Sequence, residues 1–483
     1  MPELAIKQTP IPGLLVISLD VRADNRGWFK ENWQRQKMVD LGLPDFAPVQ
    51  NNMSFNNRVG ATRGIHAEPW DKLVSLATGR IFGAWVDLRR GEGFGRCFTA
   101  ELGPETAIFV PRGVGNAFQT LAEQTAYSYL VNDHWTPAAK EAYTFVNLAD
   151  ETLAINWPIP LADADLSEAD KTHPRLADVR PLEPKKTLII GGGGQLGRAL
   201  IKAIPTAVPL TRTTLDLANP ESLTAFDFGP YGIVINAAAY TKVDAAETET
   251  GRREAWAVNV GGLGALVEAA REHRFTLVHF SSDYVFDGAQ EVHSETEPFS
   301  PLGVYGQTKA AGDALVGSLP AHYVLRTSWV IGDGHNFVRT MATLADRGVN
   351  PEVVDDQFGR LTFTAEISRA IVHLLEIDAP YGTYNLSSHG DSMTWAGIAR
   401  AVFEARGRDA ASVRSVTTAE YAAGKSLAPR PQHSVLSLDK IISSGFQPAD
   451  AMPQLQAYLS ALSSSPWGTP DLDPASAHEQ RAH

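Results

Sequence analysis

The hydrophobic pattern in the first part of the chain indicates short strands. Apolar runs rich in β-branched and aromatic residues are separated by Gly, Pro and Asn, and they include LLVISLDV, KLVSLATGRIFGAWVDLR, AIFVPRG and TAYSYLVN. Helical periodicity is confined to 31–41. Such runs predict an all-β domain, an antiparallel sandwich or small barrel of jelly-roll, cupin-like type, whose interior can hold a ligand.

The pattern changes after the polar, proline-bearing stretch 161–186. Apolar runs then alternate with helical patterns such as 255–270, and these runs lie at 187–190, 231–240, 274–282 and 321–328. This alternation predicts a doubly wound parallel α/β sheet of Rossmann type with a small substrate-binding subdomain. We therefore expect domains at 1–183 and 184–465. Residues 466–483 lack apolar periodicity and are expected to be a disordered tail.

A glycine-rich loop opens the second domain. In TLIIGGGGQLGRALIKAI an apolar run leads directly into glycines and then into a helical pattern. The glycines allow a tight turn and a close approach of backbone N–H groups to a pyrophosphate, whose charge the helix N-terminus favours. The loop predicts a dinucleotide site formed by Gly191, Gly194, Gln195, Leu196 and Gly197.

A tyrosine and a lysine four residues apart follow later in this domain. Tyr305 and Lys309, in GVYGQTKAAGD, lie one above the other on a helix face, where an ammonium can lower the pKa of a phenol. FSSDYVFDG, upstream, supplies the hydroxyl of Ser282. Alone, this spacing also fits an ordinary solvated helix face. Behind a glycine-rich loop it predicts an oxidoreductase that reduces a carbonyl group.

Charge and cysteine content narrow the class of protein. The 483 residues carry a formal net charge of −13, which disfavours binding to nucleic acid or to anionic membranes. The single cysteine, Cys97, excludes an intrachain disulfide and a cysteine-based zinc cluster. No signal-peptide pattern and no apolar run long enough to span a membrane is seen, so we expect a cytoplasmic, soluble protein.

Polar residues of the first domain suggest an anion site. Arg26, Arg63, His66 and Lys72 could together bind a diphosphate and an enolate, although a single histidine can equally be structural. His66 and Glu68 are two possible metal ligands, but Asn116 stands where a third imidazole would be useful. We expect no other histidine nearby, so the sequence predicts no metal.

Several motifs of the first domain carry a family resemblance. RGWFKENW, QNNMSFNNRVGATRGIH, DKLV, VDLRRGEGFGR, FVPRGVGNAF and INWP, in this order, resemble the dTDP-4-dehydrorhamnose 3,5-epimerase family over 5–180. The resemblance implies that His66 is the base, aided by Asp170, that Lys72 stabilises the enolate and that Tyr129 is the acid. It also implies a substrate-binding set: Arg26, Glu31, Asn52, Ser54, Arg63, Asn116 and Trp135.

Two positions depart from that family pattern. Asn116 replaces the histidine of the family's Ala-His-Gly turn, and Trp135 replaces a stacking tyrosine. The second change is mild. The first could limit epimerisation to one of two carbons or lower its rate.

The second domain resembles the dTDP-4-dehydrorhamnose reductase family, a branch of the extended short-chain dehydrogenases, over 187–462. The motifs are GGGGQLG, VINAAAYTKVDAAE, SSDYVFDG, YGQTK, LRTSWVIGDGHNFV, DDQFGRLT and RPQHSVL. The resemblance implies that Tyr305 donates a proton, that Lys309 lowers its pKa and holds the ribose, and that Ser282 polarises the carbonyl. It places Asn236, Ala237, Ala238, Ala239 and Thr241 along the cofactor, and Trp329, Asn336 and Arg430 on the substrate.

The choice of cofactor depends on the end of the second strand. No acidic residue there is placed to bind a ribose 2′-hydroxyl, whereas Arg212 could meet a 2′-phosphate, with Asp216 close by in the sequence. The sequence therefore favours NADPH and leaves NADH open. Some members of the family bind Mg²⁺ through acidic residues, and Ala199 replaces one of these acids, which argues against Mg²⁺ here.

Together the two resemblances predict a bifunctional enzyme of dTDP-L-rhamnose biosynthesis, because the product of the epimerase is the substrate of the reductase. Its partner is a dTDP-4-keto-6-deoxy sugar, and a homodimer through the N-terminal barrel is expected. One alternative is a reductase whose N-terminal domain is only a ligand-binding or dimerisation module. Another is a non-catalytic NADP-binding regulatory subunit, against which the Ser282, Tyr305 and Lys309 set argues.

Overall fold

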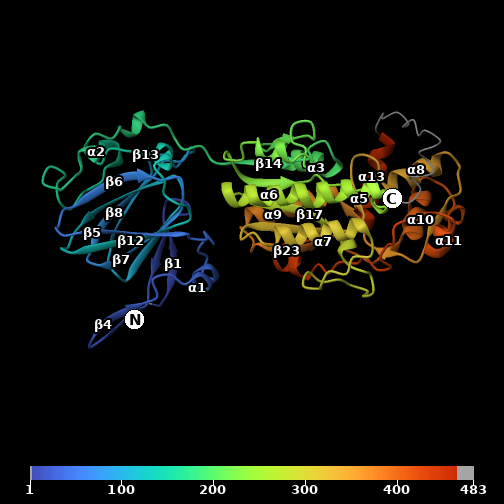
Figure 1. Cartoon of the computed structure of the whole chain (residues 1–483), viewed down its shortest axis with the longest axis horizontal. Helices are drawn as coiled ribbons and strands as arrows, with labels where there is room; N and C mark the ends of the chain where they lie inside the picture. Colours follow the sequence, from blue (N-terminus) through green and yellow to red (C-terminus); the bar gives the residue numbers. More distant parts are fainter. Residues whose placement is uncertain (1–2, 465–483) are drawn as a thin grey trace. The chain divides into compact units, whose positions relative to one another are not determined.

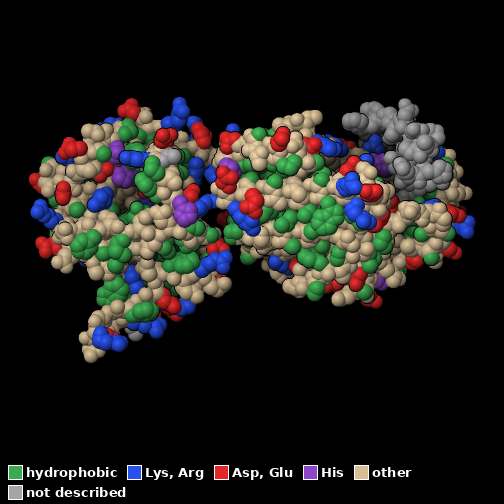
Figure 2. Space-filling view, viewed as in Figure 1, with side chains coloured by type: hydrophobic (Ala, Val, Ile, Leu, Met, Phe, Trp, Pro, Cys, Tyr) green, Lys and Arg blue, Asp and Glu red, His purple; other side chains and the backbone are tan. Residues whose placement is uncertain are grey.

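The computed structural model describes residues 3–464 (Figure 1). The chain divides into two compact units, Met1–Pro184 and Lys185–His483. The predicted tail at 466–483 lies outside the described residues. No described helix is long and apolar enough to cross a membrane. On the face seen in Figure 2, acidic and basic side chains are interspersed over each unit.

The first unit contains two antiparallel sheets. The six-stranded sheet has the order β1 (Ala5–Gln8), β2 (Leu15–Ser18), β10 (Thr106–Val110), β7 (Lys72–Thr78), β12 (Thr125–Val131), β5 (Gln50–Asn56). The five-stranded sheet has the order β13 (Thr144–Phe145), β6 (Thr62–Ala67), β11 (Val114–Thr120), β8 (Ile81–Asp87), β9 (Cys97–Leu102). Non-consecutive strands lie side by side in both sheets, so residues far apart in the sequence meet.

The core of this unit lies between the two sheets. Val74 and Leu76 of one sheet belong to the same buried cluster as Trp85 and Phe118 of the other. Strands β2 and β5 alternate buried and more exposed residues. Strands β7, β8 and β11 are buried along most of their length, because further apolar clusters cover the outer faces of the two sheets. The outer elements are β3 (Val21–Asp24), β4 (Gly27–Lys30), α1 (Arg35–Asp40) and α2 (Glu168–Lys171).

Helix α1 is shorter than the helical periodicity at 31–41 indicates. It begins at Arg35 because the Gln34 side chain accepts a hydrogen bond from the Lys37 backbone N–H and caps the helix. The hairpin β3–β4 precedes it and points away from the two sheets (Figure 1).

The second unit is built on a six-stranded parallel sheet. Its order is β15 (Val208–Leu210), β14 (Lys186–Ile190), β16 (Tyr231–Asn236), β17 (Thr276–Ser282), β18 (His322–Thr327), β23 (Gly382–Leu386), with every neighbouring pair parallel. Its central strands β17 and β18 are buried at all positions but the first, because helices cover both faces of the sheet. These helices are α3 (Gln195–Ala203), α4 (Pro220–Thr224), α6 (Leu263–His273), α7 (Val304–Val316), α9 (Thr364–Glu376) and α12 (Asp439–Ser443), and α5 (Glu249–Trp256) precedes α6.

The helix predicted at 255–270 is interrupted. A π-helical turn, Ala257–Gly262, separates α5 from α6. Gly262 passes so close to the backbone of Leu217 that a Cβ would lie 2.1 Å from its carbonyl oxygen, so only glycine fits at this position.

A further hydrophobic cluster is formed by elements that follow β18. It joins residues of α8 (Phe337–Asp346), α10 (Trp395–Ala405) and α13 (Ala451–Ser464). The short elements of this region are β19 (Val330–Ile331), β20 (Glu352–Val354), β21 (Phe358–Gly359), β22 (Thr362–Phe363), β24 (Met393–Thr394), β25 (Arg414–Val416) and α11 (Thr418–Ala422). This cluster lies apart from the two that cover the parallel sheet.

Candidate functional sites

A histidine and an aspartate meet in the first unit although they are 104 residues apart in the sequence. His66 lies on β6, opposite Asn116 of β11 on one side and Phe145 of β13 on the other. Its Nε2 lies 2.8 Å from Oδ1 of Asp170, in α2. Because the carboxylate accepts, Nε2 carries the hydrogen and Nδ1 is left as the basic nitrogen.

Asp170 is held ionised by its neighbours. Burial alone would raise its pKa, but hydrogen bonds from His66, Ser167 and His173 hold that pKa below its ordinary value. The side chain of His66 is 31% exposed, so a ligand can reach it, whereas Asp170 is buried. An imidazole oriented by a buried carboxylate has the geometry of a general base.

A second histidine shares the same carboxylate, contrary to the expectation that no other histidine lies near His66. His173 Nε2 is 3.2 Å from Asp170 Oδ1, and its ring stacks on Phe145 with centroids 4.6 Å apart. This contact could not be predicted from the sequence, because it depends on how the chain turns after α2 ends at Lys171. Donor atoms of His66, Asp170 and His173 lie within 4.8 Å of one another, so this group could hold a cation.

A buried ion pair joins Lys72, at the start of β7, to Glu68, the residue after β6. Lys72 Nζ, on β7, is 2.5 Å from Glu68 Oε1, and it lies over the ring of Tyr129 at 5.3 Å from the centroid. Burial lowers the pKa of Lys72 and the carboxylate of Glu68 opposes this shift. Burial, together with Glu68, raises the pKa of Tyr129 to about 12. Glu68 thus counteracts the effect of burial on Lys72, a role that the sequence did not reveal.

Asn116 is buried and hydrogen-bonded to two aromatic residues of the cluster between the sheets. Its Oδ1 accepts a hydrogen bond from Trp85 Nε1 at 2.9 Å, and its Nδ2 donates to the Tyr127 hydroxyl at 3.0 Å. Asn116 is therefore a structural partner of two aromatic residues as well as the strand neighbour of His66.

The remaining residues predicted to bind substrate in this unit are dispersed. Arg26 lies on the β3–β4 hairpin, 84% exposed and paired with Asp24, and the exposed Glu31 is paired with Lys37. The structure does not bring these two into the His66 group. The others lie on or next to β5 and β6: Asn52, Ser54, Arg63 and Trp135.

The glycine-rich loop of the second unit joins β14 to α3. Gly197 packs against the start of the loop so closely that a Cβ would lie 2.2 Å from the Gly191 carbonyl oxygen. Gly193 has nothing within 4 Å of where its Cβ would lie, which leaves the backbone open to a ligand. The N-terminus of α3 at Gln195 follows directly and offers unpaired N–H groups to an anion.

A cavity of about 260 Å³ begins at this loop. It collects six residues predicted to bind the cofactor: Gly191, Arg212, Asp216, Ala238, Ala239 and Thr241. Arg212 is exposed and lies 3.2 Å from Asp216, and Lys242 also lines the cavity. A cavity that has two cations and the glycine-rich loop in its lining fits a dinucleotide.

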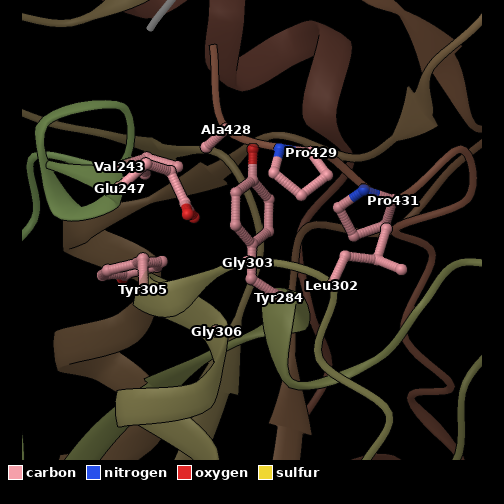
Figure 3. Close-up of a pocket in the computed structure, with 10 residues that line it drawn as sticks. All are labelled: Val243, Glu247, Tyr284, Leu302, Gly303, Tyr305, Gly306, Ala428, Pro429 and Pro431. Atoms are coloured by element: carbon pink, nitrogen blue, oxygen red, sulfur yellow. The ribbon is translucent and has the colours of Figure 1, made fainter. Parts of the chain in front are cut away.

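The predicted carbonyl-reducing residues meet where β17 ends. Tyr305, on α7, lines a narrow hollow together with Tyr284, Glu247 and the chain at 428–431 (Figure 3). Glu247 accepts a hydrogen bond from the backbone N–H of Val304 at 2.8 Å and fixes the start of α7. The Ser282 hydroxyl lies close to the Tyr305 phenol and acts to lower its pKa, against the larger effect of burial.

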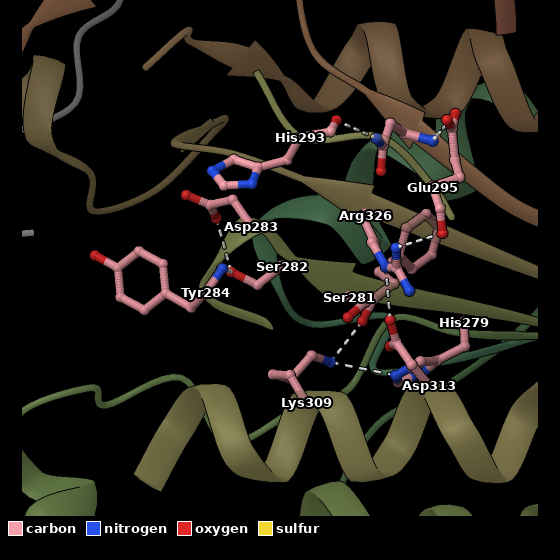
Figure 4. A network of polar contacts seen from close by, with 12 residues as sticks. His279, Ser281, Ser282, Asp283, Tyr284, His293, Glu295, Lys309, Asp313 and Arg326 are labelled. Atoms are coloured by element: carbon pink, nitrogen blue, oxygen red, sulfur yellow. Dashed lines mark hydrogen bonds and ion pairs between the residues drawn. The ribbon is translucent and has the colours of Figure 1, made fainter. Parts of the chain in front are cut away.

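Lys309 is directed into the protein. Its Nζ donates to the Phe280 carbonyl oxygen at 2.5 Å and lies 3.2 Å from His279 Nε2 (Figure 4). Burial lowers the pKa of Lys309 to about 8. Burial, followed by the charge of Asp283, raises the pKa of Tyr305, so this structure does not show the lowering of the phenol pKa that the sequence spacing indicates.

Three residues predicted to bind substrate lie around the α8–α10 cluster. Trp329 stacks on Trp395 with ring centroids 3.8 Å apart. Arg430 and Trp395 line a cavity of about 240 Å³, and Arg430 is paired with Asp244 at 2.9 Å. Asn336 instead caps α8 and donates to the Tyr458 hydroxyl, so its amide is used within the protein.

Comparisons with known proteins give different matches for the two units of the chain. The profile of dTDP-4-dehydrorhamnose 3,5-epimerase matches residues 8–178, and that of the RmlD substrate binding domain matches residues 185–464. A Streptococcus pyogenes protein named Protein RmlC homolog is 53% identical over 180 residues, covering 36% of this chain and 90% of its own length.

Two relatives match the second half. The dTDP-4-dehydrorhamnose reductase of Aggregatibacter actinomycetemcomitans is 37% identical, covering 56% of this chain and 99% of its own length. The crystal structure of the dTDP-4-dehydrorhamnose reductase of Bacillus anthracis in complex with NADP is 30% identical, covers 58% of this chain and 99% of that chain, and has a TM-score of 0.53.

Proposed function

Because the chain belongs to the dTDP-4-dehydrorhamnose 3,5-epimerase family in its first half and to the RmlD substrate binding domain family in its second, we propose that it is a bifunctional enzyme. It epimerises dTDP-4-dehydro-6-deoxy-D-glucose at C3 and C5 and reduces the C4 ketone, which yields dTDP-L-rhamnose. The observation that carries this proposal is the presence of two separate acid–base groups, around His66 and around Tyr305, in one chain.

The first unit catalyses epimerisation by proton transfer next to a ketone. His66 removes the proton at the carbon beside C4 through Nδ1, while Asp170 holds Nε2–H and stabilises the imidazolium. The Lys72 ammonium stabilises the enolate oxygen, and Tyr129 returns a proton to the opposite face. Glu68 keeps Lys72 charged within the barrel.

The second unit reduces the C4 ketone. Bound NADPH supplies the hydride. Tyr305 donates its proton to the carbonyl oxygen, and Ser282 hydrogen-bonds to the same oxygen as negative charge develops. Lys309 holds a ribose hydroxyl and the glycine-rich loop holds the pyrophosphate. Arg212 and Lys242 support NADPH over NADH, because both cations line the cavity where a 2′-phosphate would be bound.

The finer features of the assembly are part of the same proposal. The first unit is a jelly-roll, cupin-like barrel, and the α8–α10 cluster is the substrate-binding subdomain of the second. A homodimer through the barrel is supported by Met53 and Phe55, which are 64% and 58% exposed on β5, at the edge of its sheet. A cytoplasmic location stays a prediction.

A second candidate function keeps only the reductase. Asn116, which replaces the histidine of the family pattern, is occupied by Trp85 and Tyr127, and this favours a barrel that binds sugar nucleotide without transforming it. Incubation of the whole protein with the 4-keto sugar nucleotide in D₂O, without NADPH, distinguishes the two. Deuterium at C5 or C3 supports the bifunctional enzyme, and its absence at both carbons supports the reductase alone.

A further inference from the structure

A buried carboxyl group adjoins the predicted carbonyl-binding serine. Asp283 is the residue after β17 and is 3% exposed. Ser282 Oγ donates a hydrogen bond to Asp283 Oδ1 at 2.8 Å (Figure 4). The mechanism proposed above assigns Asp283 no task, although a buried carboxylate without an adjacent cation is costly to maintain.

The hydrogen bonds of Ser282 limit what it can do. A serine hydroxyl has one hydrogen to donate and two lone pairs that accept. Ser282 Oγ accepts from the backbone N–H of Tyr284 at 3.2 Å, and its single hydrogen goes to Asp283. In this arrangement Ser282 can accept from the Tyr305 hydroxyl but cannot donate to a substrate carbonyl oxygen.

Protonation of Asp283 reverses this limit. With a hydrogen on Oδ1, the carboxyl group donates to Ser282 Oγ, which then accepts two hydrogen bonds and has its own hydrogen free. The substrate carbonyl oxygen needs such a donor when negative charge develops on it.

The surroundings of Asp283 suit a neutral acid. Its side-chain partners are hydroxyls, which can turn from donor to acceptor: Ser282, Ser328 at 3.5 Å from Oδ2, and Ser434. Its own backbone N–H is a further donor. Burial raises the pKa of Asp283 to about 6, and the hydrogen bonds from Ser434 and Ser282 and the field of His293 oppose this shift.

Two tyrosines close to Asp283 interact with its charge. The charge of Asp283 raises the pKa of both Tyr305, on α7, and Tyr284. Arg430 and Asp244 act on Tyr284 from the other side, and His293 is itself paired with Glu297 at 2.9 Å. When Tyr305 gives up its proton, a phenolate forms close to Asp283, and a neutral Asp283 removes the repulsion between them.

We propose that Asp283 acts as a neutral carboxylic acid during reduction, donating its hydrogen to Ser282 Oγ so that the Ser282 hydroxyl points to the C4 carbonyl oxygen of the sugar. Asp283 is thus a positioning residue that acts through Ser282, and the inference rests on the proposed reductase function. Ionisation of Asp283 takes the Ser282 hydrogen away from the substrate and slows reduction.

The test follows NADPH oxidation against pH in the full-length protein, with saturating NADPH and substrate already epimerised by another enzyme. For the wild type, kcat falls by roughly tenfold per pH unit above the pKa that Asp283 has in the complex. In Asp283→Asn the amide N–H donates to Ser282 at every pH, so this fall disappears and the low-pH rate stays within about tenfold of wild type.

The variant Ser282→Ala serves as the matched control. It lowers kcat by roughly 10²–10³-fold, as expected for the loss of one donor to an oxyanion, and it also abolishes the fall with pH. In the Ser282→Ala background, Asp283→Asn then changes nothing, because both residues act through one hydrogen bond. If Asp283→Asn does not fold, the wild type and Ser282→Ala alone still decide, since an identical fall with pH in both overturns the inference.

Two failures are distinguishable. A wild type that oxidises no NADPH at any pH contradicts the proposed reductase and the inference with it. A wild type that is active, with the same fall with pH in Asp283→Asn, or with equal effects of Asp283→Asn in the presence and absence of Ser282, overturns the inference alone.

Discussion

The two candidate sites differ in how the chain builds them. In the first unit, His66 and Asp170 meet across 104 residues because the antiparallel sheets place non-consecutive strands next to each other. In the second, Ser282 ends β17 and Tyr305 and Lys309 follow on α7, so consecutive elements bring them together. The first site therefore depends on the register of a whole sheet, and the second on one strand end and one helix.

The two sites also differ in how they hold charge. The first has compensated charges, with His66 beside Asp170 and Lys72 beside Glu68. Burial displaces pKa values in both sites, and in the second it lowers that of Lys309 to about 8 and raises that of Asp283 to about 6. Such displaced pKa values suit a site that passes a proton once per turnover from a buried donor.

The largest expected effect is at Tyr305. Tyr305→Phe removes the proton donor and little surface, so we expect reduction of pre-epimerised substrate to fall roughly 10²–10⁴-fold while NADPH binding is retained. Deuterium exchange by the first unit should be unchanged. A variant that keeps more than about a tenth of wild-type reduction would remove Tyr305 from the mechanism.

A comparable loss of activity, in the first unit, is expected on mutation of His66. His66→Asn should lower the rate of deuterium exchange at C5 and C3 roughly 10²–10⁴-fold, because the base is lost. Tyr305-dependent reduction of pre-epimerised substrate should stay intact. The exposed His134 provides the matched control, and His134→Asn should exchange at the wild-type rate. Equal exchange in both variants would show that His66 is structural.

A smaller effect is expected in the cofactor cavity. Arg212→Ala should raise the KM for NADPH by roughly 10–100-fold, the range for a lost charge-assisted hydrogen bond, and leave the KM for NADH unchanged. Arg253→Ala, which removes another exposed guanidinium, one paired with Glu249, is the control. An equal change for both cofactors would mean that Arg212 does not contact the 2′-phosphate.

The smallest effect concerns the stability of the first unit. Asn116→Ala leaves the buried Trp85 N–H and the Tyr127 hydroxyl without their partner, so we expect the first unit to lose about 1–3 kcal/mol in its free energy of unfolding. Asn57→Ala, at an exposed position, should stay within about 0.5 kcal/mol of wild type. Equal urea midpoints for the two variants would contradict the structural role of Asn116.

The sequence predicts those parts of the molecule that depend on local pattern. The parallel sheet, the loop at Gly191 and the proximity of Ser282 to Tyr305 follow from short motifs whose hydrophobic period and glycine spacing are visible in the chain. The pairing of Asp170 with His66 was predicted from the family resemblance and not from the hydrophobic periodicity.

Contacts set by tertiary structure escaped prediction. His173 beside Asp170 and the pairing of Arg430 with Asp244, 186 residues away, depend on how distant segments pack, and no local pattern encodes them. Asn336, which the family resemblance places on the substrate, also caps α8, and its role in binding stays a prediction. The motif around Ser282 also contained Asp283, and only its burial draws attention to it.

The most direct test of the central claim uses the whole protein and no other enzyme. We expect dTDP-4-dehydro-6-deoxy-D-glucose and NADPH to give stoichiometric NADPH oxidation and dTDP-L-rhamnose, identified by NMR of the product. His66→Asn and Tyr305→Phe, each inactive alone, should restore this turnover when mixed. Oxidation of NADPH only after an external epimerase is added would contradict the account and leave the reductase as the sole activity of the chain.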